Sequence, residues 1–137
     1  MKTRLHWANS ALVYCPILYA VCYSEADFKR ELKRLKVKAD VPFMASTHAH
    51  MTTHHFEMGG KNIAIVCVGD TSTLRLVEIV GLLAHEATHI WQTAKDHIGE
   101  HRPSAEFEAY SIQWIVQQLI ESWAAKDKRG KALMRKP

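Results

Sequence analysis

Residues 74–95 read LRLVEIVGLLAHEATHIWQTAK and contain the longest helical pattern in the chain. Apolar side chains recur at the period of about 3.6 residues that marks an α-helix, and further apolar residues cover much of the remaining circumference. A helix that is apolar nearly all round is normally buried. We therefore expect a central, buried helix from Leu74 to about Lys95, with a polar start signal at residues 71–73.

This helix contains His85-Glu86-Ala87-Thr88-His89, an HExxH pattern. At about 100° per residue, His85 and His89 lie one turn apart on one face, so both imidazoles can reach one metal ion. Glu86 projects beside that ion, where a carboxylate can take a proton from water. Three such side chains would be costly to bury without a metal or partners. The pattern therefore predicts metal ligands at His85 and His89 and a catalytic general base at Glu86.

A catalytic zinc site needs a third protein ligand and an open position for water. The next acidic residues follow Pro103 in the sequence EFEAY, residues 106–110, at the start of another predicted helix. Glu106 and Glu108 are both candidates for the third ligand. His101, in Gly99-Glu100-His101, is another.

The chain resembles the gluzincin type of zincin-like metallopeptidases through HEATH at 85–89 and EFEAY at 106–110, over roughly residues 43–120. The resemblance implies an α+β, zincin-like domain that binds one Zn²⁺ through His85, His89 and Glu106. It places Tyr110 at a supporting position where the family has Asp or Asn. Small proteins of phages and prophages look similar. His101 resembles the third histidine of Spartan-type (SprT-like) DNA-repair proteases, although the glycine that follows it there is missing.

Shorter patterns predict the other elements. A capping box at Ser24 and Asp27 opens an amphipathic helix that runs to about Val37, with a basic face that we read as solvated. A last helix should run from about Pro103 to Lys126. The apolar run at residues 11–23 leaves strand and helix open.

A β-hairpin is expected between these helices, with one strand from about Phe43 to Phe56, a Gly-Gly turn, and a second strand from Asn62 to Val68. The elements would form a small antiparallel or mixed sheet. In zincins an edge strand binds the substrate as an added strand, and either strand of the hairpin could do this. The first strand carries a cluster of four histidines: His48, His50, His54 and His55. The spacing of His48 and His50 would place them on one strand face. We expect the cluster to lie near an active cleft or to be exposed, rather than to bind a second metal.

Composition limits the class of protein. With 137 residues, 47% hydrophobic and 23% charged, the chain fits one zincin-like domain over residues 1–137, with a basic, flexible tail from about 127. The run at 11–23 is interrupted by Pro16 and shorter than the ~20 residues of a membrane span, so we expect no membrane partner. Three cysteines in apolar segments match no zinc or redox spacing, which favours buried thiols and a cytoplasmic location.

The sequence thus predicts a zinc-dependent metallopeptidase that hydrolyses a peptide bond in a peptide or protein substrate, through a water activated by zinc with Glu86 as general base. One alternative is a non-catalytic, zinc-stabilised binding module closed by a fourth ligand such as His101. Another is a nucleic-acid-associated protease, because the net charge is +4 and the C-terminus is basic. Three residues remain candidates for the oxyanion donor: Tyr110, His97 and His50.

Overall fold

The computed structural model describes residues 5, 7–8 and 16–136. Cys15 and most of the first half of the run at 11–23 lie outside the described residues, and the second half of that run is a strand. The elements in chain order are β1 (Trp7–Ala8), β2 (Ile17–Cys22), α1 (Glu25–Arg34), β3 (Met51–Met58), β4 (Lys61–Val68), α2 (Leu76–His97), α3 (Ala105–Ala124), α4 (Lys128–Lys131) and the 3₁₀ helix η1 (Ala132–Met134).

The strands form one mixed sheet in the order β1-β2-β4-β3. β2 and β4 are parallel, in a register that pairs Cys22 with Cys67, whereas β3 and β4 are an antiparallel hairpin. Its two-residue turn is Gly59-Gly60, with φ of 57° and 78°, a conformation that glycine adopts without steric cost. The predicted mixed α and β composition with a small sheet is confirmed, and β3 is an edge strand.

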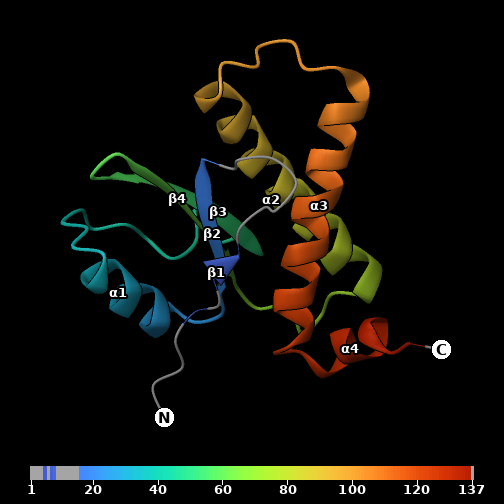
Figure 1. The fold of residues 1–137 in the computed structure, drawn as a ribbon. Helices are drawn as coiled ribbons and strands as arrows, with labels where there is room; N and C mark the ends of the chain where they lie inside the picture. The colour runs from blue at the N-terminus through green and yellow to red at the C-terminus, as the bar shows by residue number, and fades with distance from the viewer. Residues whose placement is uncertain (1–4, 6, 9–15, 137) are drawn as a thin grey trace.

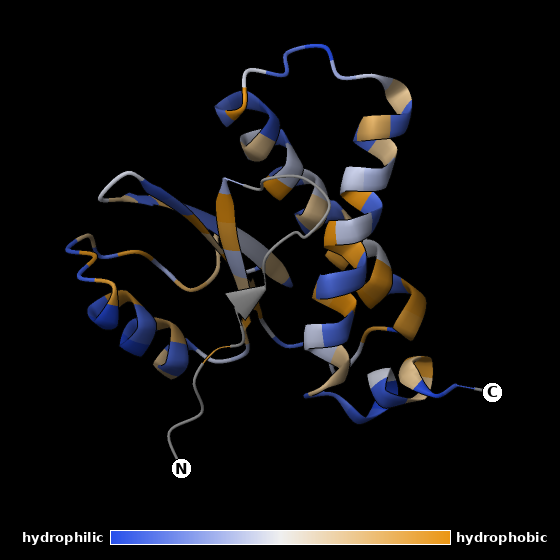
Figure 2. Cartoon of the chain, in the orientation of Figure 1, coloured by the Kyte–Doolittle hydropathy of each residue, from blue (hydrophilic) through white to orange (hydrophobic). Residues whose placement is uncertain are grey.

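Helices cover both faces of the sheet (Figure 1), with α1 on one side and α2 and α3 on the other. Alternating side chains of each strand separate two hydrophobic clusters. Ala64 and Val66 of β4 pack toward α2 and α3, while Ile63 and Ile65 pack toward α1. Figure 2 shows that β2 is largely hydrophobic, whereas the α2–α3 loop is hydrophilic.

Two predicted boundaries on the α1 side of the chain are wrong. Ser24 caps α1 by accepting a hydrogen bond from the Asp27 amide at 3.1 Å, as expected, but the helix ends at Arg34 because Lys36 adopts a positive φ of 59°. β3 begins at Met51 rather than near Phe43, because residues 43–50 form bends and turns. His48 and His50 therefore do not share a strand face.

The helices on the other side also differ in detail from the prediction. α2 begins two residues later than expected, at a cap where Glu78 accepts from the Arg75 amide at 2.8 Å. One face of α2 is buried rather than its whole circumference, since Val77 is 65% exposed. α3 begins after Ser104, which caps it in place of Pro103. None of the helices in the described ranges is long and apolar enough to cross a lipid bilayer.

The basic C-terminal segment, where we expected no firm helix, forms α4 and η1. Its anchor is Arg129, which donates hydrogen bonds to the carbonyl oxygens of Thr71 and Leu74 and is also paired with Asp127 at 2.8 Å. These bonds attach the segment to the loop before α2.

Candidate metal centre

His85 and His89 lie on the exposed flank of α2, one turn apart as the motif requires. Their Nε2 atoms are 3.0 Å from each other, and the rings meet edge to face with centroids 4.7 Å apart. Two nitrogen ligands of a tetrahedral zinc ion, each ~2.0–2.1 Å from the metal, stand about 3.3 Å apart. The two imidazoles therefore converge with nearly the spacing that one ion would need.

Gln92, one turn further along α2, fixes the orientation of the second histidine. Its Oε1 atom lies 3.2 Å from Nδ1 of His89. A carbonyl oxygen can only accept, so Nδ1 carries the proton and Nε2 keeps its lone pair. A hydrogen bond of this kind to the second ring nitrogen is typical of metal-binding histidines. The sequence analysis did not assign this role to Gln92, although its i+3 position from His89 signals a shared helix face.

Glu86 is buried between α2 and the sheet, with only 5% of its surface exposed. Its Oε2 atom accepts a hydrogen bond from the Thr53 hydroxyl of β3 at 2.5 Å. Within the part of the chain that the structure describes, no partner is found for the other oxygen, Oε1. Thr53 thus holds the carboxyl group in place and leaves one oxygen available.

The same face of β3 presents His55 to α2, two residues beyond Thr53. Partial burial lowers the pKa of His55, the neighbouring His89 and His54 lower it further, and Glu86 raises it. His55 therefore lies within electrostatic range of both the second histidine of the motif and its glutamate. Met51, Thr53 and His55 are alternate residues of β3 and therefore share one face of the strand. The sequence would predict this shared face once the start of the strand is known.

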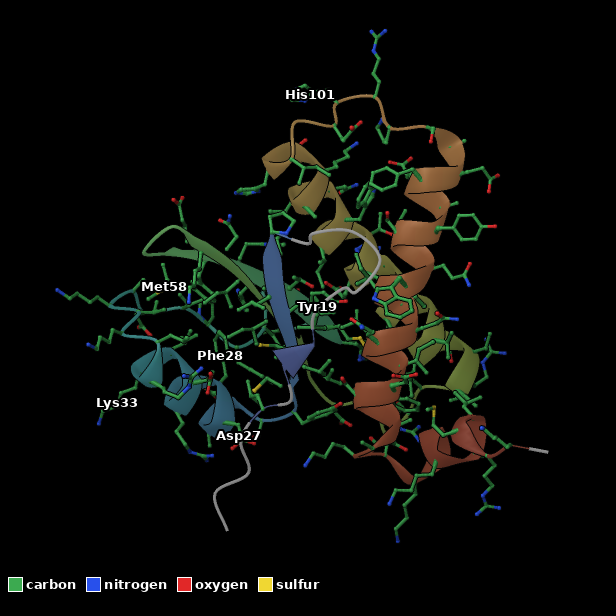
Figure 3. The ribbon with its side chains drawn as sticks, in the orientation of Figure 1. Tyr19, Asp27, Phe28, Lys33, Met58 and His101 are labelled. Carbon is green, nitrogen blue, oxygen red and sulfur yellow. The ribbon has the colours of Figure 1, made fainter. Side chains whose placement is uncertain are left out.

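The candidates for a third ligand are not brought to the histidine pair. Glu108 accepts a hydrogen bond from the Trp91 indole at 2.8 Å, Glu106 is exposed in the first turn of α3, and His101 lies on the α2–α3 loop (Figure 3). At about 100° per residue, Trp91 points some 160° away from His89, so α3 packs on the opposite flank of α2. No group of three His, Cys, Asp or Glu side chains able to hold a metal occurs in the described residues.

The other predicted residues are dispersed. Tyr110 is 59% exposed on α3, and the Nδ1 atom of His50 contacts the Asp70 carbonyl at 3.0 Å. His97 contacts the Thr93 carbonyl through Nδ1 at 2.7 Å. His54 faces α1, where its ring stacks on Phe28. His55 lies on the face of β3 that also carries Thr53, the partner of Glu86.

The donor set fits part of a zinc site: two imidazoles with converging nitrogens, one of them oriented by an amide, next to a positioned carboxylate. Comparisons with protein-family models, curated proteins and solved structures give no match to this chain. The functional interpretation therefore depends on the motif and its geometry.

Proposed function

We propose that the chain is a zinc-dependent metallopeptidase in which His85 and His89 hold the ion and Glu86 is the general base. The observation that carries the proposal is the 3.0 Å approach of the two Nε2 atoms on an exposed helix flank. A zinc ion held there would polarise a substrate carbonyl and make water more acidic. The resemblance of HEATH at 85–89 to gluzincin metallopeptidases supports the same activity.

Glu86 is suited to proton transfer because its two carboxyl oxygens differ. Oε2 is engaged by Thr53, so Oε1 is the atom that accepts the proton of the attacking water. Glu86 then gives this proton to the amine nitrogen that leaves when the peptide bond breaks. Burial in a low-dielectric environment and a fixed hydrogen bond keep the carboxyl group from turning away between these steps.

β3 provides the place for an extended substrate. It ends the sheet, and among the described residues its main chain has no pairing along the edge away from β4. A peptide added there by main-chain hydrogen bonds would lie along the strand that presents Thr53 and His55 to α2. β4 is an interior strand and cannot take this role. We therefore assign substrate binding to β3.

The third protein ligand has two candidates that rest on different evidence. Glu106 is the ligand implied by the resemblance, and His55 is the residue favoured by position, since β3 flanks the histidine pair and α3 does not. Zinc affinities of Glu106→Gln and His55→Gln, measured by competition with a chromophoric chelator, distinguish them. The true ligand is the one whose replacement weakens binding more.

Hydrolysis of quenched-fluorescence casein by the zinc-loaded chain tests the proposed activity. Glu86→Gln should keep its zinc and lose about 10²–10⁴-fold in rate, because only the base is removed. Glu121→Gln makes the same charge change on an exposed position of α3 and should retain full activity. Equal rates for the wild type and Glu86→Gln would refute the assignment of the base.

A further inference from the structure

A second surface lies on the other side of the sheet from the histidine pair. It is a groove of about 560 Å³ between α1 and the segment that follows it. Four lysines line the groove, Lys29, Lys33, Lys36 and Lys38, together with one acidic residue, Asp40. The lining residues therefore carry an excess of three positive charges, four lysines against one aspartate, on a surface that is otherwise apolar.

The groove is a fixed feature of the backbone. After α1 the chain reverses through two hydrogen bonds, from the Lys36 amide to the Lys33 carbonyl at 3.1 Å and from the Val37 amide to the Leu32 carbonyl at 2.9 Å. These bonds form a Schellman motif, and Val37 and Leu32 both belong to the hydrophobic cluster beneath α1. The motif folds residues 37–41 back beside the helix and makes the second wall of the groove.

Lys36 occupies the position of this motif where glycine is most common. Its φ of 59° is a left-handed conformation, which is unfavourable for a residue with a Cβ atom. A lysine at this point is thus unfavourable for folding, whereas it adds a cation to the groove. Local strain of this kind is often found at binding sites.

Most of the positive charge in the groove is not neutralised by the protein. Lys29 is paired with Glu25 at 2.7 Å, and the two arginines of α1 are also paired with acids of the helix. Lys33, Lys36 and Lys38 take part in no ion pair within the described ranges. Figure 3 shows Lys33 extending away from the sheet, on the side of α1 opposite to Phe28.

We propose that this groove binds the sugar–phosphate backbone of single-stranded nucleic acid. Lysine ammonium groups on flexible stems bind phosphates as point charges, and the apolar lining at Leu32 and Val37 suits the sugars and bases between the phosphates. The lining residues include no aromatic side chain on which a base could stack, so the phosphate contacts supply the affinity, and such contacts do not distinguish one sequence from another.

Fluorescence anisotropy with a labelled 20-nucleotide single strand over a salt series tests the proposal. The triple variant Lys33→Ala/Lys36→Gly/Lys38→Ala should lose more than tenfold in affinity. The slope of log affinity against log salt concentration should become shallower by about 2, because each of the three lost phosphate contacts contributes about 0.7. The control Lys126→Ala/Lys128→Ala/Lys131→Ala removes the same charge from the C-terminal segment and should change affinity less than twofold.

The single variant Lys36→Gly separates binding from folding. It relieves the left-handed strain, so its thermal midpoint should equal or exceed that of the wild type while its affinity for the strand falls. Absence of salt-dependent binding by the wild type would overturn the proposal, as would equal losses in the two triple variants. Displacement of the strand by polyglutamate at equal charge concentration would instead identify an acidic peptide as the ligand.

Discussion

Replacement of Thr53 by valine tests the contact between the edge strand and the HExxH helix. The two side chains have nearly the same shape, so the change removes the hydroxyl that donates to Glu86 Oε2 at 2.5 Å and little else. A hydrogen bond to a charged group contributes about 1.5–3 kcal/mol, and its loss leaves a carboxyl group that is 5% exposed without this donor. We expect the free energy of unfolding to fall by this amount.

Urea denaturation of the metal-free protein, monitored by far-ultraviolet circular dichroism, measures this loss. Thr53→Ser keeps the donor and should lose no more than about 0.8 kcal/mol for one methyl group. In a Glu86→Ala background, Thr53→Val should cost nearly nothing, because the acceptor is already absent. An equal cost of Thr53→Val in both backgrounds would refute the reasoning, since the hydroxyl would then act through another group.

Three further predictions concern the metal, the packing and the pH dependence. Gln92→Ala should weaken zinc binding about 10–100-fold in a chelator competition, because His89 loses the acceptor that orients it, and unchanged affinity would exclude that role. Gly130→Ala would place a Cβ atom 2.6 Å from the Trp123 ring and should lower stability by about 1–3 kcal/mol in thermal melts, whereas a midpoint equal to wild type would contradict this packing. Arg129 donates to Asp127 and lowers the pKa of that carboxyl, so this pair stabilises the fold above the unfolded-state pKa of about 3.9 and ceases to do so as pH falls below it. Asp127→Asn should therefore lower the free energy of unfolding at pH 7, and this loss should shrink below about pH 4. A loss that does not depend on pH would contradict the assignment.

Local sequence patterns predict much of this fold because local forces determine those elements. Three of these patterns depend only on residues close together in the sequence: the Ser24 cap, the Gly59-Gly60 turn and the apolar period of α2. The structure has all three elements. The predicted start of β3 is wrong because Phe43 packs against the cluster under α1 from a loop. From the sequence alone, an aromatic residue that packs from a loop cannot be distinguished from one in a strand.

The geometry of the candidate site was less predictable, because it depends on which flank of α2 each neighbour covers. The motif itself predicts the convergence of His85 and His89, since one helical turn determines it. Neither the contact of Thr53 with Glu86, 33 residues apart, nor the docking of α3 through Trp91 follows from any local pattern. The resemblance implied Glu106 as the third ligand, whereas α3 packs on the opposite flank of α2, and no third ligand joins the histidine pair within the described residues.

Zinc stoichiometry tests the central claim most directly. The wild type, Glu86→Gln and His85→Ala/His89→Ala would be loaded with Zn²⁺, passed through gel filtration to remove free metal, and analysed by inductively coupled plasma mass spectrometry. The account predicts one zinc per chain in the wild type and in Glu86→Gln, and none in the double histidine variant, because the two Nε2 atoms that converge at 3.0 Å are ligands and the carboxylate is not. A wild type without zinc, or a double variant that retains it, would contradict the account.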